Sequence, residues 1–386
     1  MKTIKLPSVI ILIAIASVLL AGCAVISTPA APTVGASPLS PTRAPAPLSP
    51  VATPAPSVLA TPAASGPRTL TVMTHDSFAA SEQVLGSFEQ ANNLKLNILK
   101  SGDAGAALNK AILAKGNPLA DVFYGVDNTF LSRALEADIF EPYAAKDAPA
   151  AFQLDKGNRV TPVDYGDVCI NFDKAYFQQK KLAPPQTLQD LLKPEYKDML
   201  VVENPATSSP GLAFMLATVA HFSPDKFLDY WGQLKANGVK VDDGWEAAYY
   251  TDFSGSSGQG PRPLVVSYAS SPPAEVVFAK TPPSDAPTGS VVGDGACFRQ
   301  IEFVGVLKGA KQPDLARKFV DFLLSVQFQE DMPLQMFVFP VNAQAKLPEA
   351  FVKYAQVPKN PATLPPDDIA KNRDTWIQKW TETVLR

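Results

Sequence analysis

The stretch TLTVMTHDS at residues 69–77 decides the fold, together with the pattern that follows it. Its β-branched run predicts a strand over 69–74, which ends at His75, Asp76 and Ser77. A helical pattern runs to about residue 91, and further segments predict a strand over 94–99, a turn over 101–105, a helix over 106–114 and a strand over 120–124. Strands that alternate with helices in this way predict an α/β sheet with parallel strands.

The same alternation returns farther along the chain. Residues 167–171, 199–202 and 263–268 have strand patterns, and helices are expected to begin near Pro210 and at Ser271. A long strand pattern over 298–307 precedes an amphipathic helix over 313–324. A chain of 386 residues is long enough for two or three domains. We therefore expect two lobes joined by crossing strands, the first from 68–166 and 298–342 and the second from 167–297 and 343–386.

The N-terminal region has the pattern of export and tethering. Lys2 and Lys5 precede an apolar run over 9–20, and the sequence LAGC at 20–23 follows. This order resembles a bacterial lipoprotein signal, in which residues 1–22 are removed and Cys23 carries lipid. An uncleaved membrane anchor is the alternative, because the apolar run extended to residue 26 approaches the length that spans a bilayer. Either interpretation places the rest of the chain outside the cytoplasm.

The segment that follows Cys23 is expected to be an extended linker, residues 23–67. Residues 28–67 contain eleven prolines and a single charged residue, Arg43. Such a composition buries too little apolar surface to fold, and its prolines keep the chain extended. The linker would hold the folded body away from the lipid.

Charge and cysteine content restrict the partners and the compartment. The chain has 34 Lys and Arg against 37 Asp and Glu, a net charge of −3, so nucleic acid is not an expected partner. With Cys23 assigned to lipid, Cys169 and Cys297 remain as an even pair in an exported protein. We predict one disulfide between them, and two buried free thiols are the alternative.

Candidate binding residues lie where predicted strands end, because ligands of open α/β sheets bind beyond the carboxyl ends of strands. These positions are residues 75–77, 101–105, 127–128, 164–165, 204–209 and 268–271. Serines, asparagines and aspartates are also ordinary helix caps, so each position alone is weak evidence. The stretch DDGWEAAYY at 242–250 places Trp245 and Tyr249 on one helical face. Two large aromatic residues on one face usually belong to a core.

The sequence has no recognisable catalytic pattern. His75 and His221 are its two histidines, no His/Cys spacing fits a zinc site, and GSSGQG at 255–260 lacks the Lys and Ser/Thr of a phosphate-binding loop. Acidic residues such as Asp242 and Asp243 or Asp76 could serve a glycosidase, but nothing in the sequence selects a pair. We expect a protein that is not an enzyme, with a secreted hydrolase as the alternative.

With these features together, the chain resembles the thiamine-binding periplasmic proteins, the solute-binding components of thiamine ABC importers. The resemblance extends from about residue 69 to 385 and is carried by residues 70–79, 120–128, 164–166, 207–212, 244–249, 266–272, 339–341 and 376–380. It implies a two-lobed periplasmic-binding-protein fold of class II, in which each lobe is a mixed sheet flanked by helices and the ligand cleft lies between the lobes. It also implies thiamine, thiamine monophosphate or thiamine diphosphate as ligand, with no cofactor and no metal.

The resemblance further implies roles for individual residues. Trp245 and Tyr268 match aromatic positions that contact the ligand, and an aromatic face attracts a thiazolium cation by about 0.5–2 kcal/mol. Asp76 and Ser77 match the loop after the first strand, where they could balance the cation or bond the pyrimidine. A helix start that could hold a phosphate through its N–H groups contains Ser208, Ser209 and Gly211. The other candidates are Asp164 and Tyr165 at the lobe crossing, Phe337 at a position of a family tryptophan, and His75, Tyr249 and Ser271.

Departures from the family pattern leave the exact cargo open. His75 and Ala274 stand where better-known members have tyrosine, and Glu82 stands near a family tryptophan. Fewer aromatic residues imply a smaller cation cage or a different cargo, such as the thiamine pyrimidine moiety, ferric ion or a polyamine. Ferric ion would use tyrosines with a histidine or carboxylate, for which Tyr249, Tyr250 and His75 are candidates. In each case we expect a monomer, anchored through Cys23 in the periplasm or on the outer face of the membrane, that serves an ABC permease and its ATPase.

Overall fold

The computed structural model describes residues 67–386 apart from 256–259 and 282. The first part of this body alternates strands and helices as predicted. It contains the parallel strands β1 (Arg68–Thr74), β2 (Leu94–Lys100) and β3 (Val122–Asp127), and the helices α1 (Glu82–Asn92) and α2 (Ala104–Leu113). Ser81 caps α1 by accepting a hydrogen bond from the N–H of Val84, and Asp103 caps α2. Strand ends and helix starts therefore meet at one edge of the sheet.

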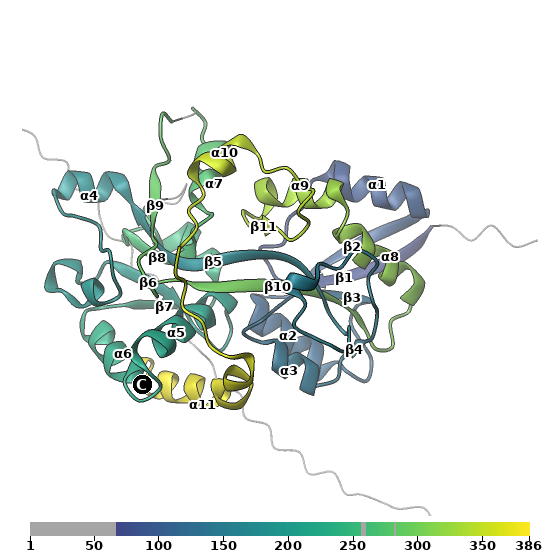
Figure 1. Ribbon diagram of the computed structural model, residues 1–386, viewed down its shortest axis with the longest axis horizontal. Coiled ribbons are helices and arrows are strands. Elements are labelled where there is room, and N and C mark those ends of the chain that lie inside the picture. Colours follow the sequence, from purple (N-terminus) through teal and green to yellow (C-terminus); the bar gives the residue numbers. More distant parts are fainter. Residues whose placement is uncertain (1–66, 256–259, 282) are drawn as a thin grey trace, which may run out of the picture. The chain divides into compact units, whose positions relative to one another are not determined.

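Two long strands, β5 (Thr161–Asp173) and β10 (Phe298–Leu307), run antiparallel through the middle of the body (Figure 1). Among the described residues, eleven strands form one sheet whose main path is β2-β1-β3-β10-β5-β8-β6-β7. On their outer sides, β10 pairs with β3 and β5 pairs with β8. These two strands are thus the crossing strands that the sequence predicts, and they carry the sheet from one side of the body to the other.

The second side of the sheet is mixed. It contains β6 (Leu200–Glu203), β7 (Lys240–Asp242), β8 (Leu264–Tyr268) and β9 (Thr288–Val291), with α5 (Ser209–Phe222), α6 (Phe227–Ala236) and α7 (Pro272–Val277). β6 is parallel to β7 and β8, whereas β8 and β9 are antiparallel to β5. α5 is buried from Ser209 to Val219, as expected of a helix that is apolar on all sides. The predicted fold class, a mixed α/β sheet flanked by helices, is confirmed.

The remaining elements are short or lie on the outside of the sheet. They are α3 (Leu131–Glu136), β4 (Phe140–Glu141), α4 (Lys174–Lys180), α8 (Pro313–Leu323), α9 (Val326–Gln335), β11 (Phe339–Pro340), α10 (Glu349–Tyr354), α11 (Pro366–Val384), a π-helix (Ala247–Asp252) and 3₁₀ turns (Ala150–Phe152, Gln189–Leu192, Pro194–Tyr196). Trp380 of α11 contacts Trp231 of α6 edge to face at 5.2 Å, while Arg373 of α11 donates to Ser132 of α3. Helix α11 therefore contacts a helix of the first part of the body, α3, and a helix of the second part, α6. The exact boundaries of the two lobes stay predictions.

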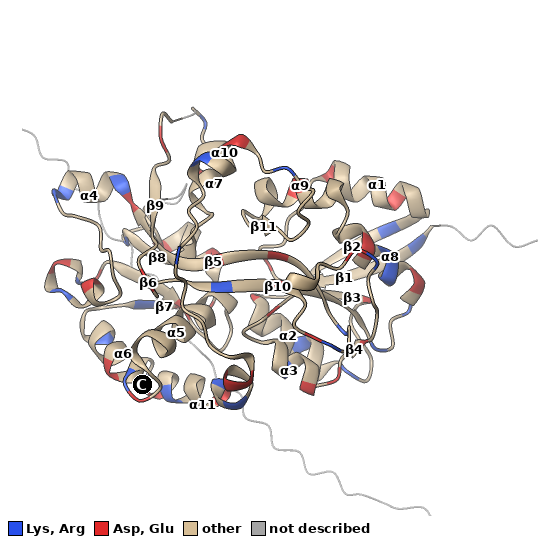
Figure 2. Cartoon of the chain, in the orientation of Figure 1, with Lys and Arg blue, Asp and Glu red and all other residues tan. Residues whose placement is uncertain are grey.

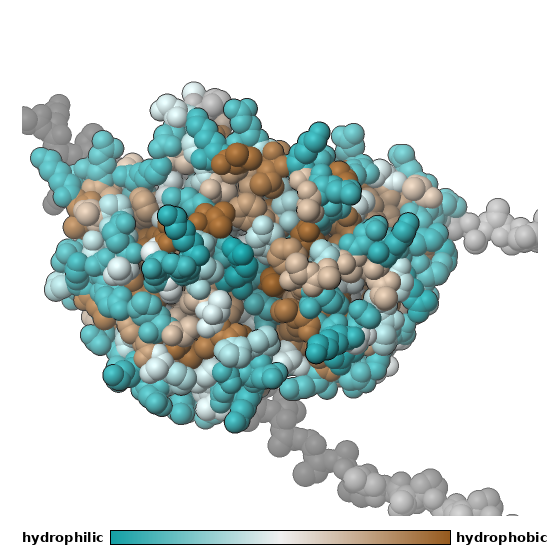
Figure 3. Space-filling view, viewed as in Figure 1, coloured by the Kyte–Doolittle hydropathy of each residue, from teal (hydrophilic) through white to brown (hydrophobic). Residues whose placement is uncertain are grey.

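The surface carries both signs of charge. Lys and Arg are interspersed with Asp and Glu over the outer helices and loops of the body (Figure 2). On the face drawn in Figure 3, hydrophilic residues cover most of the outer rim, and apolar residues appear in small separate areas. This mixed surface agrees with the small net charge of −3.

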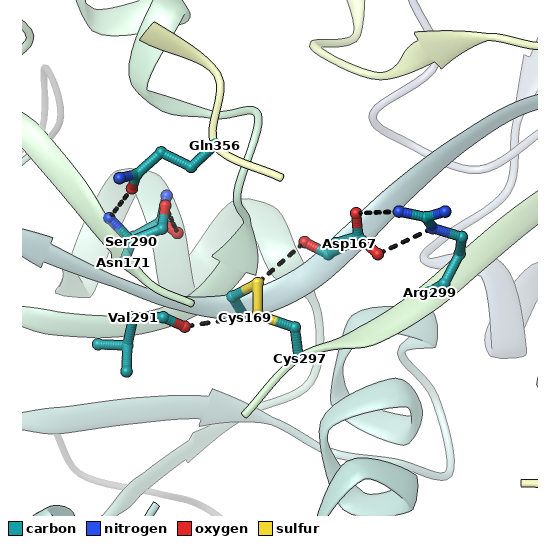
Figure 4. Close-up of a disulfide and its surroundings, with 8 residues drawn as sticks. All are labelled: Asp167, Cys169, Asn171, Ser290, Val291, Cys297, Arg299 and Gln356. Atoms are coloured by element: carbon teal, nitrogen blue, oxygen red, sulfur yellow. Dashed lines mark hydrogen bonds and ion pairs between the residues drawn. A yellow bond between two sulfur atoms is a disulfide. The ribbon is translucent and has the colours of Figure 1, made fainter. Parts of the chain in front are cut away.

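A disulfide joins the two crossing strands, as predicted from the cysteine count. Cys169 lies in β5 and Cys297 immediately precedes β10, with an S–S distance of 2.05 Å and their Cα atoms 4.3 Å apart. Beside it, Arg299 donates two hydrogen bonds of 2.9 and 2.8 Å to the Asp167 carboxylate (Figure 4). Both cysteines are fully buried, and the alternative of two free thiols is wrong.

The predicted signal peptide, the lipidated Cys23 and the linker up to residue 66 lie outside the described residues and stay predictions. Among the helices that the structure does describe, not one is both long and apolar enough to cross a bilayer.

Candidate functional site

A pocket lies where the end of β1, the start of α2 and β10 face the start of α5, the π-helix and β8. Its empty volume is ≈ 650 Å³ with the open mouth included. Eight residues predicted from the sequence line it: His75, Ser77, Ser209, Trp245, Tyr249, Tyr268, Ser271 and Phe337. The other lining residues are Asp103, Ala104, Pro210, Tyr250, Ala274, Gln300, Glu302, Met336 and Val338.

One wall of the pocket is aromatic. The rings of Trp245 and Tyr249 stack with centroids 4.8 Å apart and planes 19° apart, and Tyr250 meets Trp245 edge on at 5.4 Å. The indole N–H of Trp245 donates to the hydroxyl of Ser267 at 3.0 Å, which fixes the plane of the ring. Residues Ala247–Asp252, which include Tyr249 and Tyr250, form a π-helix rather than the α-helix expected from sequence. Such wide turns are frequent at functional sites.

Tyr249 shows how the core and the pocket share this wall. Its side chain is buried, as the core interpretation predicts, yet it also lines the pocket. Its hydroxyl donates to Glu275 at 2.9 Å. Burial, followed by the Glu275 carboxylate, raises the pKa of Tyr249 well above the ordinary value. The side chain is therefore a neutral phenol rather than a phenolate.

Tyr268 lies at the end of β8 and depends on a glycine in the neighbouring crossing strand. Its hydroxyl donates to the side-chain oxygen of Gln300 at 3.1 Å. A Cβ atom at Gly166 would lie 2.7 Å from a carbon of the Tyr268 ring, closer than van der Waals contact permits. Gly166 thus provides the space into which this ring packs.

The opposite wall is ionisable. The Nε2 atom of His75 lies 3.3 Å from a carboxylate oxygen of Glu302, and the exposed fractions of the two side chains are only 12% and 11%. Burial lowers the pKa of His75, but the charge and hydrogen bond of Glu302, together with the charges of Asp103 and Asp76, outweigh burial, so the pKa is raised overall. Burial likewise opposes ionisation of Glu302, but His75 and neighbouring hydrogen bonds bring its pKa below the ordinary value. The two side chains form a buried ion pair.

A second carboxylate, that of Asp103, joins parts of the chain that are distant in sequence. One of its oxygens accepts hydrogen bonds from the N–H of Ala104 at 2.6 Å and of Ser209 at 3.4 Å. The other accepts from the N–H of Trp245 at 2.9 Å. Burial raises the pKa of Asp103, and these N–H groups oppose that rise because they stabilise the charged form.

Three predicted residues, Asp76, Ser208 and Gly211, are not among the residues that line the pocket. The Asp76 carboxylate accepts a hydrogen bond of 2.7 Å from the N–H of Gly102 and so links the two loops after β1 and β2. Ser208 caps α5 by accepting from the N–H of Gly211 at 3.5 Å. A Cβ atom at Gly211 would lie 2.4 Å from the carbonyl oxygen of Glu203, so this glycine allows α5 to approach β6 closely.

Two further predicted residues lie on the crossing strand β5. Asp164 is buried next to Glu302 and accepts a hydrogen bond from the hydroxyl of Tyr124. Burial, then the Glu302 charge, raises the pKa of Asp164 well above its usual range. Tyr165 stacks between Phe152 and Phe339, with ring centroids 5.0 and 5.3 Å away. Neither Asp164 nor Tyr165 lines the pocket.

The departures from the family pattern also fall in distinct places. His75 and Ala274 line the pocket, so both substitutions change its walls. Glu82 is the first residue of α1 and is exposed. Glu82 is not among the residues that line the pocket.

Sequence reasoning missed Asp103, Gln300 and Glu302 as individual residues. Asp103 lies in the turn over 101–105, which the sequence indicates as a strand end, so the segment could be found from sequence although the residue was not. Gln300 and Glu302 lie within a long strand, where polar side chains ordinarily face solvent. Gln300 instead donates to Asp127 and to Ser209, which joins the two walls.

Comparison with known proteins identifies relatives of the whole body. A sequence model described as bacterial extracellular solute-binding protein matches residues 117–368. The thiamine-binding periplasmic protein of Salmonella typhimurium is 31% identical over 332 residues, which cover 85% of this chain and 96% of the relative. A solved periplasmic thiamin binding protein has a TM-score of 0.72 at 29% identity and covers 83% of this chain and 97% of its own. The periplasmic binding protein AfuA from Actinobacillus pleuropneumoniae has a TM-score of 0.68 at 22% identity, a likeness of fold alone.

Proposed function

The chain belongs to the bacterial extracellular solute-binding proteins, and we propose that its solute is thiamine, captured in the pocket between Trp245 and the His75 wall. Two relatives are named for thiamine, and their matches to this chain cover 96% and 97% of their own lengths. The protein would deliver thiamine to an ABC permease and its ATPase. The proposal includes the lipid on Cys23, which would keep the body at the membrane where the permease lies.

The chemistry of the pocket supports this cargo. Thiamine contains a flat thiazolium ring with a fixed positive charge, and the aromatic wall of Trp245 and Tyr268 offers faces that attract such a cation by about 0.5–2 kcal/mol. The opposite wall supplies carboxylates at Asp103 and Glu302. A cationic aromatic ligand thus finds both of its preferred partners in one pocket, and this combination is the observation that carries the proposal.

Calorimetric titration of the full chain, stripped of co-purified ligand by unfolding and refolding, tests the proposal. The ligands are thiamine, its mono- and diphosphate, and the free pyrimidine. We expect saturable one-to-one binding of thiamine. Heat from the pyrimidine alone would indicate a salvage importer, and no heat from any of the four would contradict the proposal.

The substitution Trp245→Ala tests the aromatic wall. Because the indole ring lines the pocket, its loss should weaken thiamine binding by roughly 1–3 kcal/mol. Tyr354→Ala is a matched control, since Tyr354 is not among the pocket residues, and it should leave the affinity unchanged. Unchanged affinity in Trp245→Ala would remove this residue from the site.

A further inference from the structure

The apolar core is continuous on one face of the sheet and divided on the other. On the face of α2, α3, α5, α6 and α11, one cluster of buried apolar side chains reaches from Phe130, beside α3, to Trp231 of α6. On the opposite face, the cluster around Val72 is separate from the cluster around Val201. A rotation that moves α3 away from α6 would therefore break apolar packing on the first face and leave the clusters of the second face intact.

Helix α11 belongs to the continuous core. Its buried residues recur every three or four positions, so they lie on one face of the helix. They are Ile369, Arg373, Trp376, Trp380 and Val384. The 19 residues of α11 span about 28 Å, and the helix runs along the lower edge of the body from α3 toward α6 (Figure 1). Trp380 contacts Trp231 edge to face at 5.2 Å, which attaches this end of α11 to the second part of the body.

The one charged side chain of this buried face, Arg373, bonds to the first part of the body. Its Nη1 atom donates to the hydroxyl of Ser132 in α3 at 2.9 Å, and its guanidinium lies 6.0 Å from the centre of the Phe130 ring. Its Nε atom donates to Asp374, which belongs to α11 itself and has a side chain that is 74% exposed. Because a buried charge is costly without its partners, the guanidinium favours the arrangement that keeps Ser132 and Phe130 beside α11.

A guanidinium differs from the apolar residues around it in the direction of its bonds. Apolar side chains tolerate small displacements of one helix along another, whereas the planar guanidinium donates in a fixed geometry. The contact between Arg373 and Ser132 is therefore made in one relative position of α11 and α3.

We propose that α11 is a strap that holds α3 of the first part beside α6 of the second part, with or without a ligand in the pocket. The two parts pivot on this side, because hinge motion needs only a few residues of the crossing strands to change φ and ψ. Arg373 is the positioning residue of the strap, since it sets how far α3 and α6 separate. The strap acts outside the pocket, for neither Arg373 nor Ser132 lines it.

Distances between spin labels on α3 and α6 test the strap without any ligand. Labels at Glu136→Cys and Asp229→Cys occupy exposed positions of these helices. The full chain carries Cys23→Ser, so that the buried disulfide is the only other cysteine pair. We expect one narrow distance distribution that stays the same when thiamine is added. A broad distribution without ligand, or one that shortens with thiamine, would overturn the inference. Failure of thiamine to bind would contradict the proposed function, while the distances without ligand still decide the strap.

The variant Ser132→Ala assigns this role to the Arg373 contact. Without ligand, loss of the acceptor should shift the label distances to longer values. Under the proposed function, thiamine should dissociate about tenfold faster, since a hydrogen bond from a charged group is lost. Ser87→Ala is the matched control, because its hydroxyl bonds within the first part, to Val84 and Gln327, and it should leave both quantities unchanged.

Wild-type label distances in a folded Ser132→Ala chain would overturn the inference. Arg373→Lys keeps the charge but loses the planar fork, and it should lengthen the distances less than Ser132→Ala does. Should either variant fail to fold, the distances in the otherwise wild-type chain, measured with and without thiamine, still decide the proposal.

Discussion

The two walls of the pocket differ in chemistry and in how they are built. The wall from β1, α2 and β10 contributes His75, Asp103 and Glu302. The wall from β8 and from the segment that leads into the π-helix contributes Tyr268 and Trp245. The His75–Glu302 pair lies within the first wall, and the Trp245 ring stacks on Tyr249 within the second. Two hydrogen bonds join the walls, from Trp245 N–H to Asp103 and from the Tyr268 hydroxyl to Gln300. We infer that charge and shape are set by separate parts of the molecule.

This difference means that each wall can be altered without the other. Loss of a charge on the first wall should change the stability of the protein and the pH dependence of that stability. Displacement of a ring on the second wall should change affinity with little effect on these properties. The following variants test this separation.

The largest effect is expected from the disulfide, which joins the strands between the two walls. Cys169 and Cys297 are 128 residues apart in sequence, and opening a loop of that size should lower the free energy of unfolding by about 4–5 kcal/mol on the chain-entropy account. The double variant Cys169→Ala/Cys297→Ala should nevertheless bind thiamine as wild type, because neither residue lines the pocket. Urea unfolding and calorimetry measure the two quantities.

The opposite result would be equally informative. A large loss of affinity with unchanged stability would mean that the disulfide sets the relation between the walls. The separation of charge and shape would then be an incomplete description of the pocket.

A smaller effect on stability is expected from Glu302→Gln. It leaves His75 without its charged partner inside the protein, and breaking a buried pair costs about 3 kcal/mol. The pKa of His75 is raised, so its share of the stabilisation is complete below the ordinary pKa of 6.5 and is lost as the pH rises through the folded value. The pKa of Glu302 is lowered, so its share is complete above 4.5 and is lost as the pH falls through the folded value.

The difference in unfolding free energy between wild type and Glu302→Gln should therefore be largest between pH 4.5 and 6.5. Chemical unfolding across a pH series measures it. A difference that does not vary with pH would show that the pair contributes by packing rather than by charge.

Much of the aromatic wall could be predicted from sequence, because its residues lie within short segments. Trp245 and Tyr249 are four apart, and Tyr268 ends a β-branched strand. The fold was predictable for the same reason, since strand runs, helix caps such as Ser81 and Asp103, and their alternation are local properties.

The ionisable wall could be predicted only in part. Asp103 bonds to Ser209 and Trp245, which are 106 and 142 residues away, so its surroundings exist only in the folded chain. Glu302 lies within β10, and nothing local shows that its side chain faces His75. The π-helix was also missed, because the four-residue spacing of aromatics fits an ordinary α-helix as well.

The smallest predicted effect concerns the support of the aromatic wall. Gly166→Ala would place a methyl group 2.7 Å from the Tyr268 ring, which must shift and lengthen its 3.1 Å hydrogen bond to Gln300. We expect thiamine affinity to fall by about 1 kcal/mol, with the pH dependence of stability unchanged because His75 and Glu302 keep their contact. Gly86→Ala is the matched control, since no atom lies within 4 Å of the added carbon and alanine favours a helix by up to about 1 kcal/mol. A changed pH dependence of stability in Gly166→Ala would mean that the Tyr268 ring and the His75–Glu302 pair act as one unit, and the two walls would have to be treated as a single coupled site.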